Sequence, residues 1–294
     1  MAARRTGKRP SEVSGTSPIR RSKMKSGTEN SMAWLGLAER VCVVTGGAGG
    51  IGSETAMQMA RAGASVAVLD RTAESCREVV ESILLEGGRA LAVACDVSSP
   101  TSVALAAEAV EGEFGPCNVL VNNAGLSGGI GKSLLDASID DWNRLLAVNL
   151  TGVFLCSQTF GKQMRDANRG GTMVHVASIG GTNAIPGGGA YSVSKAGVVM
   201  LSKQLCLEYA QYGIRSNCVS PGLVRTPMSE AFYQDAEKLR RRNEIVPSGR
   251  AAGALDIAES ILFLSSPRSG YINGEDILVE GGLSQIVMAN IPRS

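Results

Sequence analysis

Short apolar runs rich in β-branched residues alternate with longer segments of helical periodicity from residue 40 onward. Such near-continuous apolar runs are typical of parallel strands that are covered on both faces. The seven predicted strands cover 40–45, 65–70, 90–95, 118–122, 172–178, 215–220 and 276–280. The predicted helices lie near 50–62, 72–86, 99–113, 139–166, 189–212 and 254–265. This alternation predicts an α/β fold, a single doubly wound domain with a seven-stranded parallel sheet and helices on both faces.

Length and composition favour one intracellular domain without a metal centre. The chain has 294 residues, 44% of them hydrophobic, which is enough for one large core. Its seven cysteines form no Cys-x-x-Cys pair, a pattern that indicates reduced thiols and a cytoplasmic location. The single histidine, His175, lies in the apolar run 172–177, where we expect it to fill space in a strand. A histidine-based metal cluster or a Ser-His-Asp triad therefore lacks its parts.

Residues 1–35 differ from the rest of the chain. They hold eight basic and two acidic residues, whereas the remainder is mildly acidic with 21 basic and 25 acidic residues. The segment is rich in Ser, Thr and Gly without apolar periodicity, so we expect a disordered basic extension ahead of a folded domain over 36–294. An upstream start codon, with Met24 or Met32 as the true beginning, and a transit peptide or nucleic-acid-binding arm are alternatives. No apolar stretch predicts a secretory signal or a membrane span, and a nucleic-acid partner is not expected.

Glycines cluster between the first predicted strand and the first predicted helix, in the sequence T-G-G-A-G-G-I-G at 45–52. Glycines at this place let the backbone approach a pyrophosphate, whose charge then lies at the helix N-terminus. The spacing of Gly47, Gly49 and Gly52 also satisfies G-x-G-x-x-G, and a flexible turn is the simpler alternative. Because the run follows a strand and precedes a helix, it favours a dinucleotide site.

Asp70 ends the second predicted strand, 18 residues after Gly52. A carboxylate there can accept hydrogen bonds from the adenosine ribose hydroxyls and would repel a 2′-phosphate. It therefore favours NAD over NADP, although the neighbouring Arg71 could pair with a phosphate and favours the opposite choice.

Tyr191 and Lys195 open a long helical segment at positions i and i+4, so they face the same side. Such pairs are common on exposed helices, but Ser178 lies 13 residues upstream at the end of the fifth predicted strand. Asn149 falls on the apolar side of its predicted helix, where a bare amide would be costly to bury without a purpose. These four residues become the candidate catalytic set through their resemblance to an enzyme family whose catalytic serine has the same 13-residue spacing.

Together these motifs resemble the short-chain dehydrogenase/reductase family, whose patterns are T-G-x-x-x-G-x-G and Y-x-x-x-K. The resemblance runs from about residue 38 to 284 and implies a Rossmann-type fold with Asn149, Ser178, Tyr191 and Lys195 as catalytic residues. It also implies a homotetramer that includes the last strand. NADP users of the family commonly carry a basic residue where this chain has Gly49, which again favours NAD. The positions that the resemblance assigns to the cofactor are Thr45, Gly46, Gly50, Ile51, Gly52, Asp70, Arg71, Asp96, Val97, Asn123, Ala124, Gly125, Tyr191, Lys195, Pro221, Gly222, Val224 and Thr226.

The chemistry expected of this set depends on the pKa of Tyr191. A tyrosine titrates near ~10, and one ammonium at ~4 Å can supply the roughly 4 kcal/mol needed to bring its pKa to about 7. We therefore expect Lys195, helped by the positive charge of an oxidised nicotinamide, to lower the pKa of Tyr191. Tyr191 would exchange the proton of a secondary alcohol or ketone during hydride transfer, and Ser178 would hydrogen-bond its oxygen. Lys195 would bind the nicotinamide ribose, and Asn149 would position a water beside Lys195.

Substrate recognition is expected on the loop 126–132, on 180–189, and on a lid at about 227–247. The charged part of this lid predicts a solvated helix face, with an anion clamp as the alternative. One rival function is an NADPH-dependent 3-oxoacyl-carrier-protein reductase. Another is a dinucleotide-sensing protein without catalysis, and a third is nucleic-acid binding through the N-terminal extension. The expected substrate is a secondary alcohol or ketone of modest size.

Overall fold

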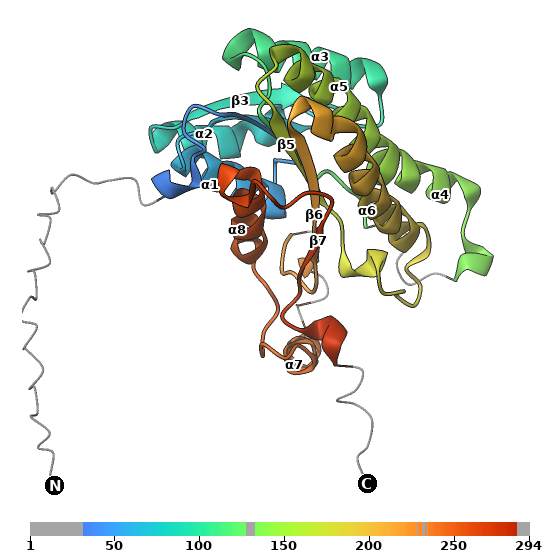
Figure 1. Ribbon diagram of the computed structural model, residues 1–294. Coiled ribbons are helices and arrows are strands. Elements are labelled where there is room, and N and C mark those ends of the chain that lie inside the picture. Colours follow the sequence, from blue (N-terminus) through green and yellow to red (C-terminus); the bar gives the residue numbers. More distant parts are fainter. Residues whose placement is uncertain (1–31, 128–132, 228, 231–232, 234, 287–294) are drawn as a thin grey trace, which may run out of the picture.

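The computed structural model describes residues 32–127, 133–227, 229–230, 233 and 235–286 (Figure 1). Its seven-stranded sheet has the order β3-β2-β1-β4-β5-β6-β7, and every neighbouring pair is parallel. The strands are β1 (Val41–Thr45), β2 (Ser65–Asp70), β3 (Arg89–Ala94), β4 (Val119–Asn122), β5 (Gly171–Val176), β6 (Ile214–Pro221) and β7 (Asp276–Val279). The predicted doubly wound fold is confirmed.

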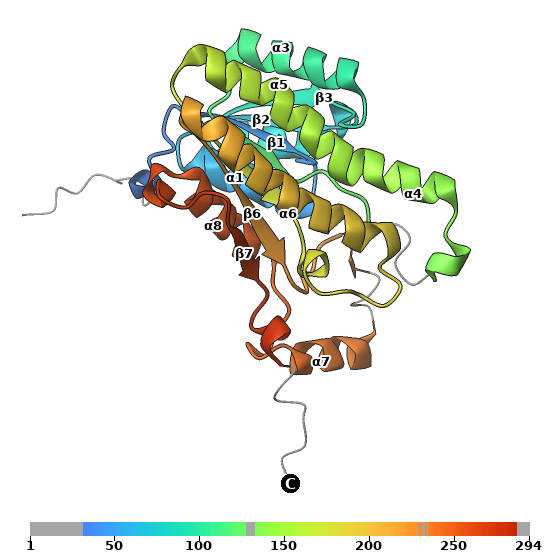
Figure 2. The same ribbon diagram turned by 45° about the vertical axis from the view of Figure 1, so that its right-hand side comes forward.

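Helices cover both faces of this sheet (Figures 1 and 2). They are α1 (Gly50–Arg61), α2 (Arg77–Leu85), α3 (Pro100–Phe114), α4 (Ile139–Leu146), α5 (Gly152–Ala167), α6 (Gly189–Tyr209), α7 (Ala236–Ile245) and α8 (Ala254–Ser265). Helices α1, α2 and α8 pack on one face, and α3, α5 and α6 pack on the other. Helix α7 lies apart from both layers, beyond the carboxyl ends of β6 and β7.

The alternation of side chains along β1 divides the core in two. Val41 and Val43 belong to the cluster under α3 and α5, whereas Cys42 and Val44 belong to the cluster under α1 and α8. All five residues of the strand are buried, as a parallel strand covered on both faces requires.

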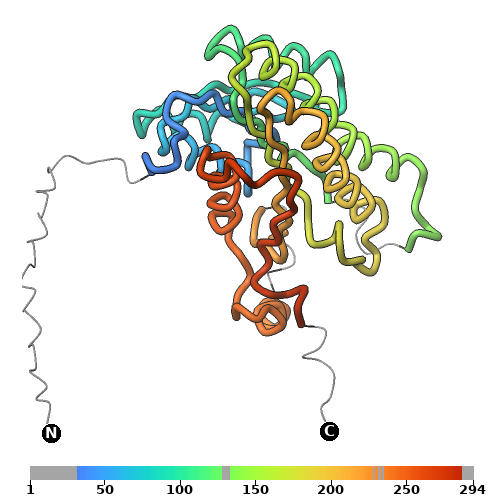
Figure 3. Tube along the Cα trace, viewed as in Figure 1, coloured from blue at the N-terminus to red at the C-terminus, as the bar shows by residue number. Residues whose placement is uncertain are grey.

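The chain path reverses its direction across the sheet after β3. It runs outward from β1 to β3 and then crosses back to β4 on the other side of β1 (Figure 3). The connections that follow β1 and β4 therefore diverge. Ligands of doubly wound sheets bind at this kind of switch point.

Most boundaries lie within a few residues of the sequence prediction, and three differences bear on the site or on the start of the folded body. The helix predicted over 139–166 is interrupted by a π-helical turn, Ala147–Thr151, which contains Asn149. Strand β5 ends at Val176, so Ser178 lies in the turn after the strand. At the N-terminus, Ala33–Leu35 forms a short 3-10 helix, and Ser266 Oγ donates a hydrogen bond to the Leu35 carbonyl at 2.6 Å. The folded body thus begins before residue 36, and residues 1–31 lie outside the described part.

His175 lies in a buried chain of hydrogen bonds that crosses the sheet. Asn122 Nδ2 lies 3.0 Å from His175 Nδ1, and His175 Nε2 lies 3.0 Å from Ser216 Oγ. Ser216 continues the chain to Ser202 on α6, and Asn122 continues it to Ser157 on α5. Because an amide nitrogen only donates, Nδ1 accepts and the Nε2 proton points at Ser216. His175 fills space inside its strand, as expected.

Burial lowers the pKa of His175 to about 3. In the unfolded chain the pKa of His175 is near ~6.5. Between the folded and the unfolded pKa, His175 of the unfolded chain therefore binds a proton that the folded protein excludes. The free energy of unfolding should therefore fall by about 1.4 kcal/mol per pH unit as the pH drops through this window. Denaturant unfolding of the wild type and of His175→Asn tests this, because the variant should lose that part of the slope. Parallel pH profiles would contradict it.

Candidate functional site

The glycine-rich turn joins β1 to α1 at the switch point. Gly46 and Gly50 have φ values of +62° and +58°, the left-handed region that favours glycine. A Cβ on Gly52 would collide with the Gly46 carbonyl oxygen, so the turn closes tightly against the helix. Gly49 at the N-cap offers no side chain to the first amides of α1. The turn thus has the free amides and the space that a pyrophosphate needs.

Hydrogen bonds join the start of the glycine-rich turn to the residues that follow β4. The Thr45 hydroxyl accepts hydrogen bonds from the Asn123 and Ala124 amides at 3.1 and 3.2 Å. Asn123 Nδ2 donates to the carbonyls of Thr45 and Gly46. These four bonds fix the carboxyl end of β1 to the segment that follows β4. Ile51, the next residue of α1 after Gly50, is partly buried and packs against the core.

The adenosine end of the predicted site has two carboxylates. Asp70 Oδ2 accepts from the Ala48 amide of the glycine turn at 3.2 Å, and its other oxygen accepts from the Arg71 amide. Hydrogen bonds from Ser98 lower the pKa of the Asp96 carboxyl, and the charge of Arg71 acts in the same direction. Val97 is buried against Gly152 of α5. The structure therefore brings Asp70 to the turn and leaves Val97 in the core.

The predicted catalytic residues converge near the carboxyl end of β5. Lys195 is only 5% exposed, and its ammonium donates a hydrogen bond to the Val176 carbonyl at 2.7 Å. The same nitrogen lies 5.9 Å from the centroid of the Tyr191 ring. Burial lowers the pKa of Lys195 to about 8, so the group stays protonated at neutral pH.

Ser178 caps the short 3-10 helix Ile179–Gly181, and its Oγ accepts a hydrogen bond from the Gly180 amide at 3.0 Å. The hydroxyl proton is therefore left to donate toward the site. Burial raises the pKa of Tyr191, and a hydrogen bond with Ser178 opposes this. The expectation that Lys195 and an oxidised nicotinamide together lower the pKa of Tyr191 concerns the cofactor complex and stays a prediction.

Asn149 is completely buried in the π-helical turn. Its Oδ1 accepts from the Leu126 amide at 2.7 Å, and its Nδ2 donates to the Leu126 carbonyl at 2.9 Å. Gly125 lies at the gap between Asn149 and Lys195, since a Cβ there would be 3.5 Å from Asn149 Oδ1 and 3.6 Å from Lys195 Nζ. The loop after β4 is thus clamped to the turn beside Lys195.

The segment after β6 reaches the glycine turn. Strand β6 ends at Pro221, and Gly222 packs against Glu280 of the next connection. Val224 forms an isolated bridge with Ala252. A Cβ on Gly50 would lie 3.5 Å from Thr226, so this segment lies against the glycine turn.

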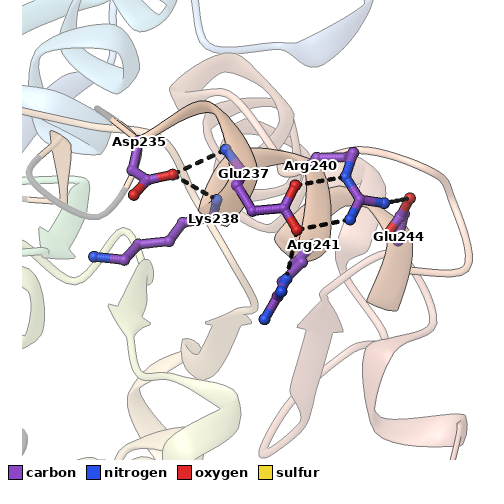
Figure 4. Close-up of polar contacts among 6 residues, drawn as sticks. All are labelled: Asp235, Glu237, Lys238, Arg240, Arg241 and Glu244. Atoms are coloured by element: carbon purple, nitrogen blue, oxygen red, sulfur yellow. Dashed lines mark hydrogen bonds and ion pairs between the residues drawn. The ribbon is translucent and has the colours of Figure 1, made fainter.

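Helix α7 carries the charged part of the predicted lid, and its charged side chains form a face exposed to solvent (Figure 4). Glu237 pairs with Arg240 and Arg241, and Arg240 also pairs with Glu244. The Asp235 carboxylate caps the helix through the amides of residues 237 and 238. All of these side chains are exposed, as expected for a solvated face. Residues 228, 231–232 and 234 of the lid and 128–132 of the substrate loop lie outside the described residues.

Sequence reasoning missed three groups that contact the predicted catalytic residues. They are the Val176 carbonyl, the Gly180 amide and the Ser194 hydroxyl. The two backbone groups carry no sequence signal of their own. Ser194 could have been found, because it lies one turn after Tyr191 on the face that carries the Y-x-x-x-K pair.

The fold and this site define a dinucleotide-binding α/β protein. The family model described as enoyl-(acyl carrier protein) reductase matches residues 46–284. The chain belongs to the short-chain dehydrogenase/reductase family, which binds a nicotinamide cofactor, and like its dehydrogenase relatives it is an oxidoreductase that acts on CH–OH groups.

Named relatives are similar over most of their length. D-threitol dehydrogenase of Mycolicibacterium smegmatis is 38% identical over 83% of this chain and 92% of its own. Cis-4-hydroxycyclohexanecarboxylate dehydrogenase of Sinomonas cyclohexanicum is 36% identical over 85% of this chain and 98% of its own.

Solved structures agree with these relatives. A short-chain type dehydrogenase/reductase from Mycobacterium marinum has a TM-score of 0.81 at 34% identity, covering 86% of this chain and 98% of that one. An actinorhodin polyketide ketoreductase with NADPH has a TM-score of 0.78 at 34% identity, covering 83% and 97%. Among the described residues, no helix has the length and apolar character needed to span a membrane.

The glycine turn gives a direct test of the dinucleotide site. Gly52→Ala should push the Gly46 carbonyl outward, lower NAD affinity by at least about ten-fold and destabilise the fold by about 1–3 kcal/mol. Gly49→Ala is the matched control, because a Cβ there meets nothing within 4 Å. Calorimetric titration with NAD measures both. Equal affinity of Gly52→Ala and wild type would exclude this turn as the binding site.

Proposed function

We propose that the chain is an NAD(H)-dependent oxidoreductase that transfers a hydride between the nicotinamide and a secondary alcohol or ketone. One observation carries the proposal: Tyr191, Ser178 and the buried Lys195 ammonium meet at the carboxyl end of β5. This phenol, hydroxyl and ammonium are the groups needed to exchange a proton with a substrate oxygen.

The roles proposed for this chain follow from its hydrogen bonds. Because Gly180 donates to Ser178, Ser178 keeps its own proton as a donor. In the structure that donor faces Tyr191, and with substrate bound it would hold the reacting oxygen beside Tyr191. Tyr191 takes the alcohol proton during oxidation and returns it during reduction. The bound nicotinamide supplies the hydride acceptor or donor and, when oxidised, a second positive charge. Lys195 offers its remaining ammonium protons to the nicotinamide ribose, and Asn149 with Gly125 borders the space beside that ammonium.

NAD is the proposed cofactor because of the charge at the end of β2. The Asp70 carboxylate borders the glycine turn, where a 2′-phosphate would meet like charge. Arg71 is exposed and adjacent, so it is the one nearby group that favours NADP. Initial rates with NADH should exceed those with NADPH. The reverse order would instead favour the 3-oxoacyl-carrier-protein reductase alternative.

The substrate is proposed to be a secondary alcohol or ketone of modest size. The named relatives act on a polyol and on a hydroxylated cyclohexane carboxylate by their names, and both classes carry a secondary carbinol. A panel of acyclic polyols and cyclic alcohols is therefore the first screen.

Tyr191→Phe tests the function directly. Removal of the phenolic hydroxyl should lower kcat by about 10²- to 10⁴-fold, because the substrate loses its proton acceptor. Affinity for NAD and the thermal unfolding temperature should stay near the wild-type values. Near-normal turnover by the folded variant would disprove the assignment of Tyr191.

We also propose a homotetramer, located in the cytoplasm. Val193, Met200 and Leu207 recur every seventh residue on α6 and are exposed, an apolar stripe suited to a partner helix. A second exposed apolar face lies on α8 and around β7, with Phe263, Tyr271 and Leu278. Two distinct faces are what a tetramer of two-fold axes uses. Free, mostly buried cysteines suit a reducing compartment such as the cytoplasm.

Sedimentation analysis tests the proposed homotetramer. It should give the mass of four copies of the chain, and the mass of a monomer would contradict this assembly.

A further inference from the structure

Ser194 connects two of the residues in the proposed mechanism. It lies on α6 between Tyr191 and Lys195, and its side chain is completely buried. Its hydroxyl donates a hydrogen bond to the Tyr191 carbonyl at 2.6 Å. The same oxygen accepts one from Asn149 Nδ2 at 3.3 Å. Through this single hydroxyl, the first turn of α6 is joined to the π-helical turn Ala147–Thr151.

The bonds of Asn149 determine which way its amide points. The Leu126 amide can only donate, so the atom facing it must be Oδ1. The nitrogen must then face both the Leu126 carbonyl and Ser194, and both of its protons are used. With Ser194 as acceptor, Oδ1 stays on the side of Gly125 and the Lys195 ammonium.

The first turn of α6 needs such an attachment. Its N-cap is Gly188, which has no side chain to bind the free amides, and the helix begins at Gly189 with a φ of +47°. Tyr191 is the third residue of this turn. The Tyr191 amide donates to the Gly188 carbonyl at 3.0 Å, and the Ser194 bond to the Tyr191 carbonyl adds a side-chain attachment to this uncapped turn.

We propose that Ser194 is a positioning residue that holds the Tyr191 backbone and the Asn149 amide in register with Lys195. The proposal rests on the proposed role of Tyr191 as acid and base. Ser194 touches no substrate atom in this account, and it acts only through the two residues that it joins.

Ser194→Ala removes both bonds at once and leaves one Asn149 proton without its acceptor. Ser202→Ala is the matched control, because Ser202 is a buried serine of the same helix whose hydroxyl pairs with Ser216 instead. Both variants lose one buried hydroxyl, so their thermal unfolding temperatures should fall by similar amounts. Their effects on Tyr191 should differ.

The first measurement is the pKa of Tyr191 in the NAD complex, obtained from phenolate absorbance after subtraction of the same variant carrying Tyr191→Phe. We expect Ser194→Ala to raise this pKa by about half a unit or more and Ser202→Ala to leave it unchanged. This readout requires NAD binding but no turnover. It therefore tests Ser194 even if the alcohol substrate proposed above is wrong.

The second measurement is steady-state oxidation of an alcohol that the wild type turns over. Ser194→Ala should lower kcat by about ten-fold, with the KM values within about two-fold, because the reacting groups are misplaced while binding is retained. Ser202→Ala should match the wild type. If the two variants have the same Tyr191 pKa and the same kcat, Ser194 is only structural and the proposal is overturned.

Discussion

The proposed chemistry depends on the burial of the Lys195 ammonium. A charge removed from water is costly unless hydrogen bonds compensate for its lost hydration. Here the Val176 carbonyl accepts one ammonium proton, and burial brings the pKa of Lys195 down to about 8. The lysine therefore remains a cation at neutral pH, in surroundings where its field is weakly screened. Because Val176 is the last residue of β5, the packing of α6 on the sheet sets the place of that charge.

Close backbone contacts allow this packing. A Cβ on Gly181 would press on the backbone of Lys195, and one on Gly197 would press on the side chain of Leu150. Small residues at these positions let α6 approach both the turn after β5 and the π-helical turn. The π-helical turn directs Asn149 inward. There its side-chain amide hydrogen-bonds the backbone of Leu126 in the loop after β4. The carboxyl ends of β4 and β5 thus meet the helix that carries Tyr191.

The parts of this arrangement that can be predicted from the sequence are those marked by apolar periodicity or by a fixed spacing between motif residues. The strands and helices were predictable from apolar periodicity, and the dinucleotide turn from glycines between a strand and a helix. Tyr191, Lys195 and Ser178 were predicted as a set because their spacing resembles that of the family, and the structure places them near one another. The π-helical turn was not, because such a turn has no residue signature of its own and only shifts the phase of the apolar pattern that follows it.

Contacts made by backbone groups were also beyond sequence reasoning. The Val176 carbonyl and the Gly180 amide act through their positions, and any residue type supplies the same group. The pKa of Tyr191 was predicted from Coulomb attraction alone, and the structure adds the cost of burying a phenolate, which raises that pKa. In the proposed mechanism, Lys195 and the oxidised nicotinamide together must overcome that cost.

Single-turnover hydride transfer from an alcohol to NAD, followed by nicotinamide absorbance from ~pH 6 to ~pH 10, tests this account most directly in the wild type and in Lys195→Met. The account predicts that the variant still binds NAD but transfers hydride at least about 100-fold more slowly at neutral pH, with its rate rising only at much higher pH. Transfer by Lys195→Met at the wild-type rate and with the wild-type pH profile would contradict it.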